Sequence, residues 1–321
     1  MKKILFVFCL CITTSLFGQE YWSIAQEQSK ANFQQNSLVN EIALDLENLS
    51  KVIDKENEIV AKNQPLLLYF PNEKNELEAF NLFSIPLFSA EIAQQYPKIM
   101  AYRGKSTTRQ SVSIRVTISP KGINGTMRIP SGMLFLQAQK EGEGKHLYYQ
   151  RSDRLYQEYG LPFCSTDLAK ISAKTKGDAM SQKAAITTSG ALKTYRFAVA
   201  GTAEYTQFWG DNDDTNGTNS EDALIAVANT VNRMNEVFEV DLGLRLELVT
   251  DASLLYTDTT TDPFGGDYNE EIQSTLTQEV GEANYDLGHL FHRGAANGDA
   301  GSVGNVCQNG QKGSAFSFCS N

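Results

Sequence analysis

The three histidines of this chain, His146, His289 and His292, are its first candidates for metal or acid–base chemistry. A helix can hold a zinc ion when two histidines stand at positions i and i+4 with a glutamate between them, because two ligands and a general base then share one face. The sequence contains no such pair. His289 and His292 lie in an apolar stretch typical of a strand, where residues three apart point to opposite faces and cannot simply share an ion. This arrangement for zinc catalysis is therefore absent, and we assign no catalytic residue in this chain. We interpret His289 as a hydrogen-bonded structural residue and place His292 at the surface.

The cysteines fall into two groups, those of the predicted leader and those that remain in the mature chain. Cys9 and Cys11 lie in an N-terminal leader and would be removed with it, which leaves Cys164, Cys307 and Cys319. An odd number of cysteines in an exported chain means that one thiol is free, ligates a metal or has lost its partner. For Cys164, a buried small residue is the alternative to a metal ligand.

Residues 211–222, DNDDTNGTNSED, offer the carboxylate and amide oxygens that calcium binds. When Gly217 is aligned with the invariant glycine of an EF-hand loop, Ala223 stands where a bidentate glutamate is required. We therefore interpret the segment as a solvated loop. Glu204 has no second acid or metal ligand at a motif spacing, so no role is assigned to it.

Residues 285–307, YDLGHLFHRGAANGDAGSVGNVC, have the pattern of a strand, a glycine-rich turn and a second strand that ends at a cysteine. Gly294, Gly298, Gly301 and Gly304 let the backbone turn and lie close to a bound chain. This pattern predicts the rim of a cleft.

The run DLGHLF, followed by a glycine-rich turn and by GNVC, resembles the upper rim of secreted bacterial reprolysin-like zinc metalloproteases, which are metzincins. Residues 194–206, 230–239 and 241–248 agree with that family in order and in approximate spacing. The resemblance covers residues 194–321, and a looser resemblance to the family's prodomain covers the part before them. In the family a zinc helix with the motif HExxHxxGxxH follows the rim. The resemblance therefore implies a precursor truncated before that helix.

The implied fold class is α/β: an incomplete metzincin-like twisted mixed sheet with helices, preceded by a β-rich prodomain. An edge strand near residues 299–303 would hold an extended protein or peptide substrate through backbone hydrogen bonds. Gly301, Ser302 and Val303 are thus the candidate substrate-binding residues. Zinc is the implied cofactor, with its ligands absent from this sequence.

The resemblance also implies roles for three other positions. Cys164 falls where related latent proteases carry a cysteine that ligates the zinc, so it is the candidate for a cysteine switch. Cys307 stands where the family has a disulfide cysteine, and Cys319 is the partner available here. Asp286 aligns with a calcium-binding aspartate of some members, which makes calcium a second candidate cofactor. Arg196, however, stands near the position of their glutamate ligand.

The first residues have the three regions of a secretory signal peptide: Lys2 and Lys3, an apolar run over residues 4–12, and small residues up to Gly18. We expect cleavage after Gly18 and a secreted protein. The uncharged run over residues 4–17 is shorter than the roughly 20 residues of a spanning helix, so no stable membrane span is expected.

The chain is predicted to have four parts. They are a signal peptide (1–18), a prodomain with an N-terminal helix and a β-rich unit (19–169), a linker rich in small residues and lysine (170–193), and the N-terminal part of a reprolysin-like catalytic domain (194–321).

Charge is unevenly divided between the two large parts. Residues 194–321 hold 5 Lys and Arg against 20 Asp and Glu, whereas the earlier residues hold 23 against 18. This balance argues against nucleic acid as a partner of the acidic part and lets the two parts attract each other. The resemblance likewise implies that the prodomain packs on the catalytic domain.

Hydrophobic periodicity predicts the elements of the N-terminal part. Apolar residues at helical spacing over residues 26–53 predict one amphipathic helix. Alternating apolar residues then predict a β sandwich or small barrel. Its expected strands are residues 66–70, 112–118, 123–129, 133–138 and 146–149.

The acidic part is predicted to begin with a β-α-β unit. A strand at residues 194–200, a helix with Glu221 and Asp222 in its first turn that runs to about residue 240, and a strand at 242–249 would form a parallel pair with a right-handed crossover. Asn219 or Ser220 is the expected helix cap. A helix at residues 270–282 and the rim strand at 285–291 would follow.

Two functions fit these observations. The first is a secreted zinc-dependent metalloendopeptidase precursor, in which zinc-activated water attacks a peptide carbonyl with a glutamate as base. The second is a non-catalytic secreted binding or protease-inhibitory protein that keeps the prodomain and a partial metzincin scaffold. Because neither the metal ligands nor the base are present, we expect the chain as given to be inactive.

Overall fold

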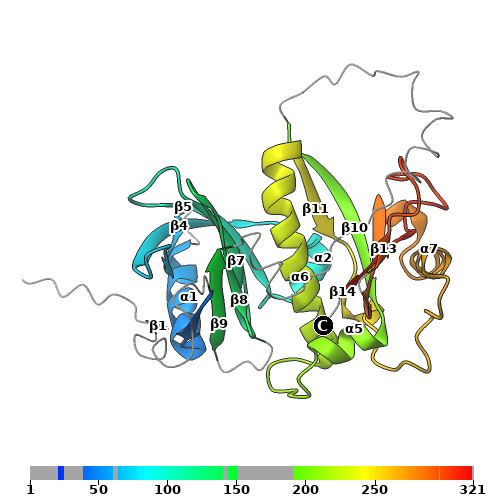
Figure 1. Cartoon of the computed structure of the whole chain (residues 1–321), viewed down its shortest axis with the longest axis horizontal. Helices are drawn as coiled ribbons and strands as arrows, with labels where there is room; N and C mark the ends of the chain where they lie inside the picture. The colour runs from blue at the N-terminus through cyan, green and yellow to red at the C-terminus, as the bar shows by residue number, and fades with distance from the viewer. Residues whose placement is uncertain are drawn as a thin grey trace, which may run out of the picture.

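The computed structural model describes residues 21–24, 39–60, 64–139, 144–150, 191–295 and 297–319, which form two units, each built on its own sheet (Figure 1). We call residues 21–150 the N-terminal unit and residues 191–319 the C-terminal unit. The predicted signal peptide, Cys164 and most of the predicted linker lie outside the described residues. Within the described ranges, no helix is both long and apolar enough to cross a membrane.

The N-terminal unit is a nine-stranded antiparallel sheet in the order β1-β2-β9-β8-β7-β6-β5-β4-β3, with helices α1 (Leu46–Val60) and α2 (Ala90–Gln95). Its strands are β1 (Trp22–Ile24), β2 (Val39–Leu44), β3 (Leu66–Pro71), β4 (Leu77–Ile85), β5 (Met100–Ser106), β6 (Ser113–Ser119), β7 (Gly122–Ile129), β8 (Gly132–Ala138) and β9 (Lys145–Gln150). All five segments predicted as strands are strands. The sequence pattern missed β1, β4 and β5; in β4, exposed Leu77 and Phe83 on the outer face hide the alternation.

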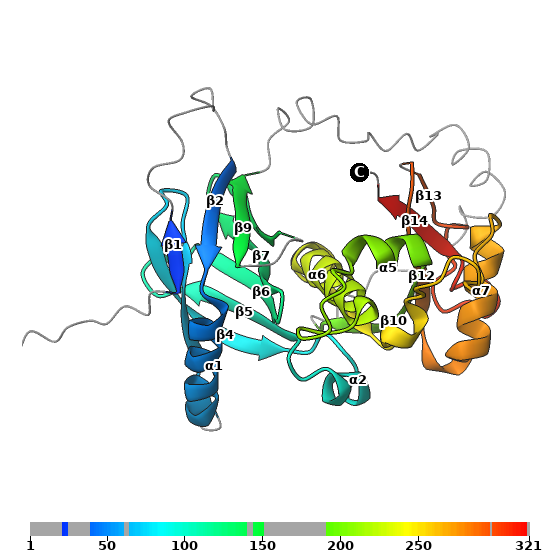
Figure 2. The ribbon, with the colours of Figure 1, turned by 90° about the horizontal axis from the view of Figure 1, so that it is seen from below.

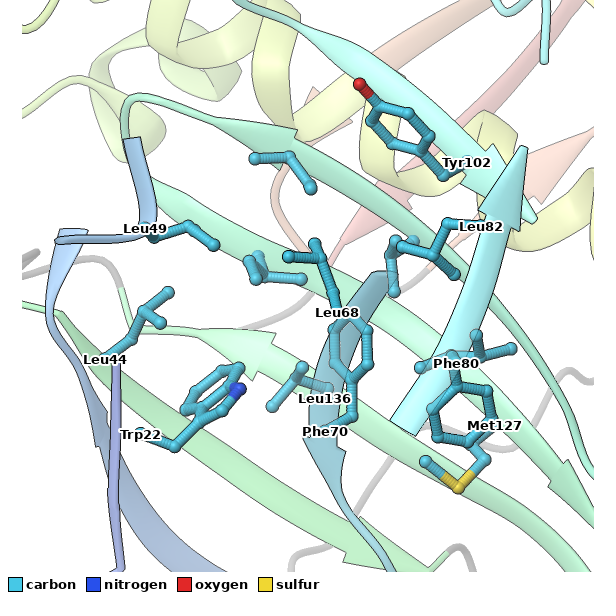
Figure 3. Packing of buried hydrophobic residues seen from close by; sticks show 14 of the residues in the cluster. Trp22, Leu44, Leu49, Leu68, Phe70, Phe80, Leu82, Tyr102, Met127 and Leu136 are labelled. Carbon is cyan, nitrogen blue, oxygen red and sulfur yellow. The ribbon is translucent and has the colours of Figure 1, made fainter. Parts of the chain in front are cut away.

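The sheet of the N-terminal unit curls until its first and last strands meet through side chains. The Tyr69 amide donates to Tyr21 Oη (2.6 Å), and Trp22 Nε1 donates to the Tyr69 carbonyl (2.8 Å). The curled sheet encloses an apolar core that includes Phe70 and Phe80 (Figure 3). The expected sandwich or barrel is thus one curled sheet whose edges are joined by side chains.

The predicted helix over residues 26–53 is confirmed from Leu46 onward and is wrong for residues 39–44. Val39–Leu44 form β2, paired with β1 and β9, and α1 begins only at Leu46. The apolar spacing was ambiguous because Ile42 and Leu44 also fit a strand whose alternate residues are buried. Pairing with two neighbouring strands then outweighs the helical pattern.

The C-terminal unit is a five-stranded sheet in the order β11-β10-β12-β14-β13, in which only the β13–β14 pair is antiparallel. Its strands are β10 (Lys193–Gly201), β11 (Leu244–Leu248), β12 (Leu287–Arg293), β13 (Gly298–Asp299) and β14 (Ala315–Cys319). Its α-helices are α5 (Ala203–Trp209), α6 (Asn219–Val237) and α7 (Tyr268–Glu279). Short helical turns are η2 (Phe238–Leu242), η3 (Ala252–Leu254) and η4 (Glu282–Asn284).

The two faces of this sheet are covered by different helices. Phe197, Val199 and Phe291 pack with the apolar face of α6, whereas Ala198 and Leu290, on the other face, pack with α7. Figures 1 and 2 show α6 between the two sheets and α7 on the far side. The mixed α/β architecture predicted for this part is therefore present.

The β-α-β unit is confirmed: β10 precedes α6 in the chain, β11 follows it, and the two strands pair in parallel. The cap of α6 is Thr218, one residue before Asn219 and two before Ser220, the expected positions. Thr218 Oγ1 accepts from the Glu221 amide, and the Glu221 side chain accepts from the Thr218 amide, which is a capping box. Glu221 and Asp222 lie in the first helical turn.

His146 makes the stability of the N-terminal unit depend on pH. Its buried ring accepts from the Ile123 amide (3.1 Å) at Nε2, so Nδ1 donates to the Gly144 carbonyl (2.8 Å). Burial lowers the pKa of His146 to about 4. Because the unfolded side chain titrates near 6.5, stability is complete above that pH and falls as the pH drops toward 4.

We expect the free energy of unfolding to fall by about 2 kcal/mol from this residue between about pH 7.5 and about pH 5. The glutamine of His146→Gln cannot take up a proton in this pH range. The variant should therefore lose this part of the pH dependence of the free energy of unfolding and should be less stable than the wild type at neutral pH. Urea unfolding at the two pH values measures both effects. Equal slopes for the variant and the wild type would contradict the prediction.

Candidate functional site

The outer edge of the C-terminal sheet is the short strand β13, which pairs antiparallel with β14 through Gly298↔Ser317 and Asp299↔Phe316. The edge strand expected near residues 299–303 therefore lies slightly earlier. Gly301, Ser302 and Val303 fall in the turn that follows it.

The turn has a local cause. Asp299 Oδ1 accepts from the Gly301 amide (2.7 Å), and Gly301 has φ +71°, a left-handed conformation that favours glycine. The chain leaves the sheet at this point. Val303 is 83% exposed in the turn.

The backbone of β13 has one amide pair that faces away from the sheet. The Asn297 carbonyl accepts from the Phe318 amide (2.8 Å), so Asn297 bonds toward β14. In an antiparallel ladder the next residue turns its N–H and C=O outward. Gly298 is that residue, and its N–H donates to Asn297 Oδ1 (2.8 Å). A bound peptide strand would therefore meet the backbone of Gly298 and displace the Asn297 side chain.

His289 is a structural residue, as its position in an apolar strand predicted. Its Nε2 lies 2.8 Å from Ser317 Oγ on β14, and its ring contacts Phe197 and Phe291. Burial lowers the pKa of His289 to about 4, so the ring is neutral at physiological pH. It joins β12 to β14 on the face that α6 covers.

His292 lies on the opposite face of β12, so the prediction that the two histidines cannot share an ion is confirmed. Its Nδ1 is 2.9 Å from Thr202 Oγ1, and its ring packs against Tyr268 and Phe318. The expectation that it lies at the surface is wrong, because its side chain is only 13% exposed. Burial lowers its pKa.

Sequence reasoning missed the polar group around His292. Glu204 Oε2 lies 3.7 Å from His292 Nδ1, and Asp262 Oδ2 accepts from the Ala203 amide (2.9 Å). These side chains gather where parallel strands β10 and β12 end, a position at which α/β sheets place functional groups. The one signal in the sequence that could have indicated this position is Thr202, a residue type that favours the start of a helix and here caps α5.

The carboxylate of Asp286, the weak calcium candidate, is bound by Arg196. Its Oδ1 lies 2.7 Å from Arg196 Nη2, and its Oδ2 accepts from both the backbone N–H (2.8 Å) and the Nε (3.2 Å) of Arg196. Hydrogen bonds from Arg196 lower the pKa of the carboxyl. The guanidinium of Arg196 thus contacts both carboxylate oxygens, and the calcium site stays a prediction.

Cys307 has an exposed free thiol, so it forms no bridge to Cys319 in this structure. Its backbone has φ +63°, and its amide donates to the Asp286 carbonyl (2.8 Å). The side chain of Cys319 and the whole of Cys164 lie outside the described residues. The disulfide and the cysteine switch stay predictions.

The middle of the acidic loop before α6, residues 212–215, is exposed, whereas Asp211 and Asp222 at its two ends are held by ion pairs. Asp211 pairs with Lys121 of the N-terminal unit, and Asp222 Oδ1 lies 3.0 Å from the same ammonium. Burial raises the pKa of Asp222 to about 6.

Over the described part of the chain, no three His, Cys, Asp or Glu side chains are placed to hold a metal. The described residues therefore do not fit a zinc site.

Residues 191–321 match the family model of the Metallo-peptidase family M12B, Reprolysin-like. The predicted resemblance of this part of the chain to reprolysin-like metalloproteases is therefore confirmed, and members of that family are in general zinc-dependent. Among solved structures, the chain is similar to the crystal structure of metalloproteinase-II from Bacteroides fragilis. The identity is 15%, the alignment covers 85% of this chain and 79% of that one, and the TM-score is 0.35. No curated protein matches.

The contact between Arg196 and Asp286 should stabilise the C-terminal unit. Arg196→Gln removes both side-chain bonds to the carboxylate and the bond from Nη1 to the Ala283 carbonyl (2.6 Å). Because the pair is partly exposed, we expect a loss of about 1 kcal/mol in the free energy of unfolding. Lys193→Gln, on the same strand with an exposed side chain, is the matched control and should change little. Similar unfolding curves for the two variants would refute this role of Arg196.

Proposed function

We propose that this chain is a secreted precursor of a reprolysin-like metalloendopeptidase, with the N-terminal unit as its prodomain and the C-terminal unit as the peptide-binding part of its catalytic domain. The match of residues 191–321 to the reprolysin-like family model carries this proposal. The leader that ends at Gly18 supports export, and Cys164 is the proposed latent zinc ligand.

The mixed sheet supports a role in holding substrate. β13 lies at the end of the sheet, antiparallel to β14, and its outward amide pair at Gly298 is the kind of group that binds an extended peptide as an added strand. Gly298 and Asp299 are exposed, so a peptide can reach the backbone from solvent. Gly301, Ser302 and Val303 would contact residues of the peptide beyond that pair.

Zinc would supply an activated water for hydrolysis in such an enzyme. The described residues do not fit a zinc site, so no hydrolytic step is assigned to them. What these residues do in the proposed function is to hold and orient a peptide. The direct test is therefore peptide binding.

Gly298→Pro should weaken that binding by about fivefold, because it removes one outward N–H donor worth about 1 kcal/mol. The substitution should leave the β13–β14 ladder intact, since that N–H is not part of it. Gly298→Ala adds a Cβ but keeps the N–H, and is the matched control. Fluorescence anisotropy of the full chain with a labelled pool of octapeptides measures the affinity.

The same assay has a second arm. Asn297→Ala frees the Gly298 N–H from its internal acceptor and should raise the peptide affinity. Absence of binding by the wild type, or equal affinities for Gly298→Pro and Gly298→Ala, would refute β13 as the peptide-binding edge.

A further inference from the structure

The N-terminal unit covers the edge of the C-terminal sheet that lies opposite β13. A residue after β4, Phe88, pairs in parallel with Leu248 of β11. The Ser89 amide donates to the Leu248 carbonyl (2.8 Å), and the Leu248 amide donates to the Leu87 carbonyl (2.8 Å). β11 and β13 are the two ends of the five-stranded sheet. One end is therefore occupied by the N-terminal unit, while the other holds the proposed peptide edge.

A buried charged contact fixes α6 to the N-terminal sheet. Arg115 of β6, 3% exposed, donates to both oxygens of Glu239 (3.0 and 2.9 Å), and its Nε donates to Asn232 Oδ1 (2.7 Å). Asn232 Nδ2 in turn donates to Thr117 Oγ1 (2.9 Å). Burial alone would raise the pKa of Glu239, but hydrogen bonds from Arg115 and Arg245 hold it at about 2. The carboxylate is therefore charged throughout the physiological range.

The other ion pairs across this contact have the same polarity. Lys121 pairs with Asp211 and Asp222, and Arg128 Nε lies 3.3 Å from Glu236 Oε1. In each pair the cation comes from the N-terminal unit and the carboxylate from the C-terminal unit. Opposite charges arranged in this way favour association of two separate surfaces and make it sensitive to salt.

The contact also has the mixed character of a separable interface. Apolar Ile85, Leu87 and Phe88 pack into the core cluster of α6 and β11. A cavity of about 260 Å³ also lies between the two units, and its lining mixes polar residues such as Asn124 and Asn229 with apolar residues such as Ile225. Contacts between domains are typically more polar than a single core.

We propose that the face formed by α6 and the outer edge of β11 is a docking surface that holds the N-terminal unit without a covalent link and leaves β13 open. The N-terminal unit would then remain bound when the chain is cut between residues 150 and 191, and would not compete with a peptide at β13. The proposal does not depend on hydrolysis. It concerns the described residues of the N-terminal unit, 21–150.

The test uses the full chain with a cleavage site for a sequence-specific protease placed between residues 151 and 190. After cutting of the folded protein, size-exclusion chromatography should show one species that contains both pieces at about 50 mM salt, with weaker association at about 500 mM. Arg115→Gln should weaken association at least about tenfold, because it breaks a buried charge pair. Glu239 keeps Arg245 as a partner, so the variant is expected to fold.

Lys51→Gln is the matched control, since it removes one positive charge from α1 at a side chain that is 69% exposed and paired only within its helix in the described structure. It should leave association unchanged. Separation of the wild-type pieces at low salt would overturn the proposal. So would equal association of Arg115→Gln and Lys51→Gln.

A second measurement tests the open edge without relying on peptide binding. Val303→Cys places a thiol in the exposed turn after β13, and mass spectrometry can follow its reaction with a maleimide. The rate should be the same, within about twofold, for the cut complex and for the C-terminal piece separated from it. A rate about tenfold higher after separation would show that the N-terminal unit covers this edge. Failure of the octapeptide assay alone would refute the proposed peptide binding and leave the docking result standing.

Discussion

The guanidinium of Arg115 imposes the strictest constraint on how the two units fit together. A buried cation is costly unless its charge is paired and its donors are satisfied. Arg115 stands on β6 of the N-terminal unit, but Glu239 and Asn232 lie in the C-terminal unit. The guanidinium reaches all of these acceptors only when α6 lies across the N-terminal sheet in the observed position. Apolar contacts elsewhere between the two units, such as those of Leu87 and Phe88, would tolerate small shifts, whereas a bidentate pair with a third hydrogen bond would not.

A second constraint, close packing around β12, organises the C-terminal sheet. Gly288 belongs to the DLGHLF run, and a Cβ at this position would collide with Leu276 of α7 and lie 2.8 Å from Gly313 Cα. Glycine therefore lets α7 and the turn before β14 approach the sheet. The same strand carries His289 toward Ser317 on one face and His292 toward Thr202 on the other. The run that carries the family resemblance thus has a packing role in this chain, separate from any metal.

These constraints assign different tasks to the two ends of the C-terminal sheet. β11 is paired with residues 87–89, so its backbone groups are already used. β13 has an outward amide pair, covered only by the Asn297 side chain in the described structure. An added strand would therefore have a place at β13, while the N-terminal unit is held at β11 by backbone hydrogen bonds and near α6 by opposite charges. This division follows from strand order, since the ends of an open sheet are the positions where backbone groups remain available.

The sequence by itself determined the local elements and the balance of charge. Apolar periodicity located β10, α6 and β11, and alternation located five strands of the N-terminal unit, because these patterns reflect which side of each element is buried. The spacing of His289 and His292 was sufficient to place them on opposite faces. The excess of acids after residue 193 anticipated attraction between the two parts, now seen as pairs such as Lys121 with Asp222.

Only the tertiary structure decided what depends on contacts between distant segments. Residues 39–44 form β2 because two strands pair with it, although their spacing also suits a helix. Asp286 is bound by Arg196, 90 residues earlier, and Glu204 lies beside His292 because two parallel strands end together. The edge strand ends at Asp299 because its side chain and Gly301 form a turn. Local patterns record burial and propensity, whereas the partner of a charge and the end of an edge strand depend on where the rest of the chain lies.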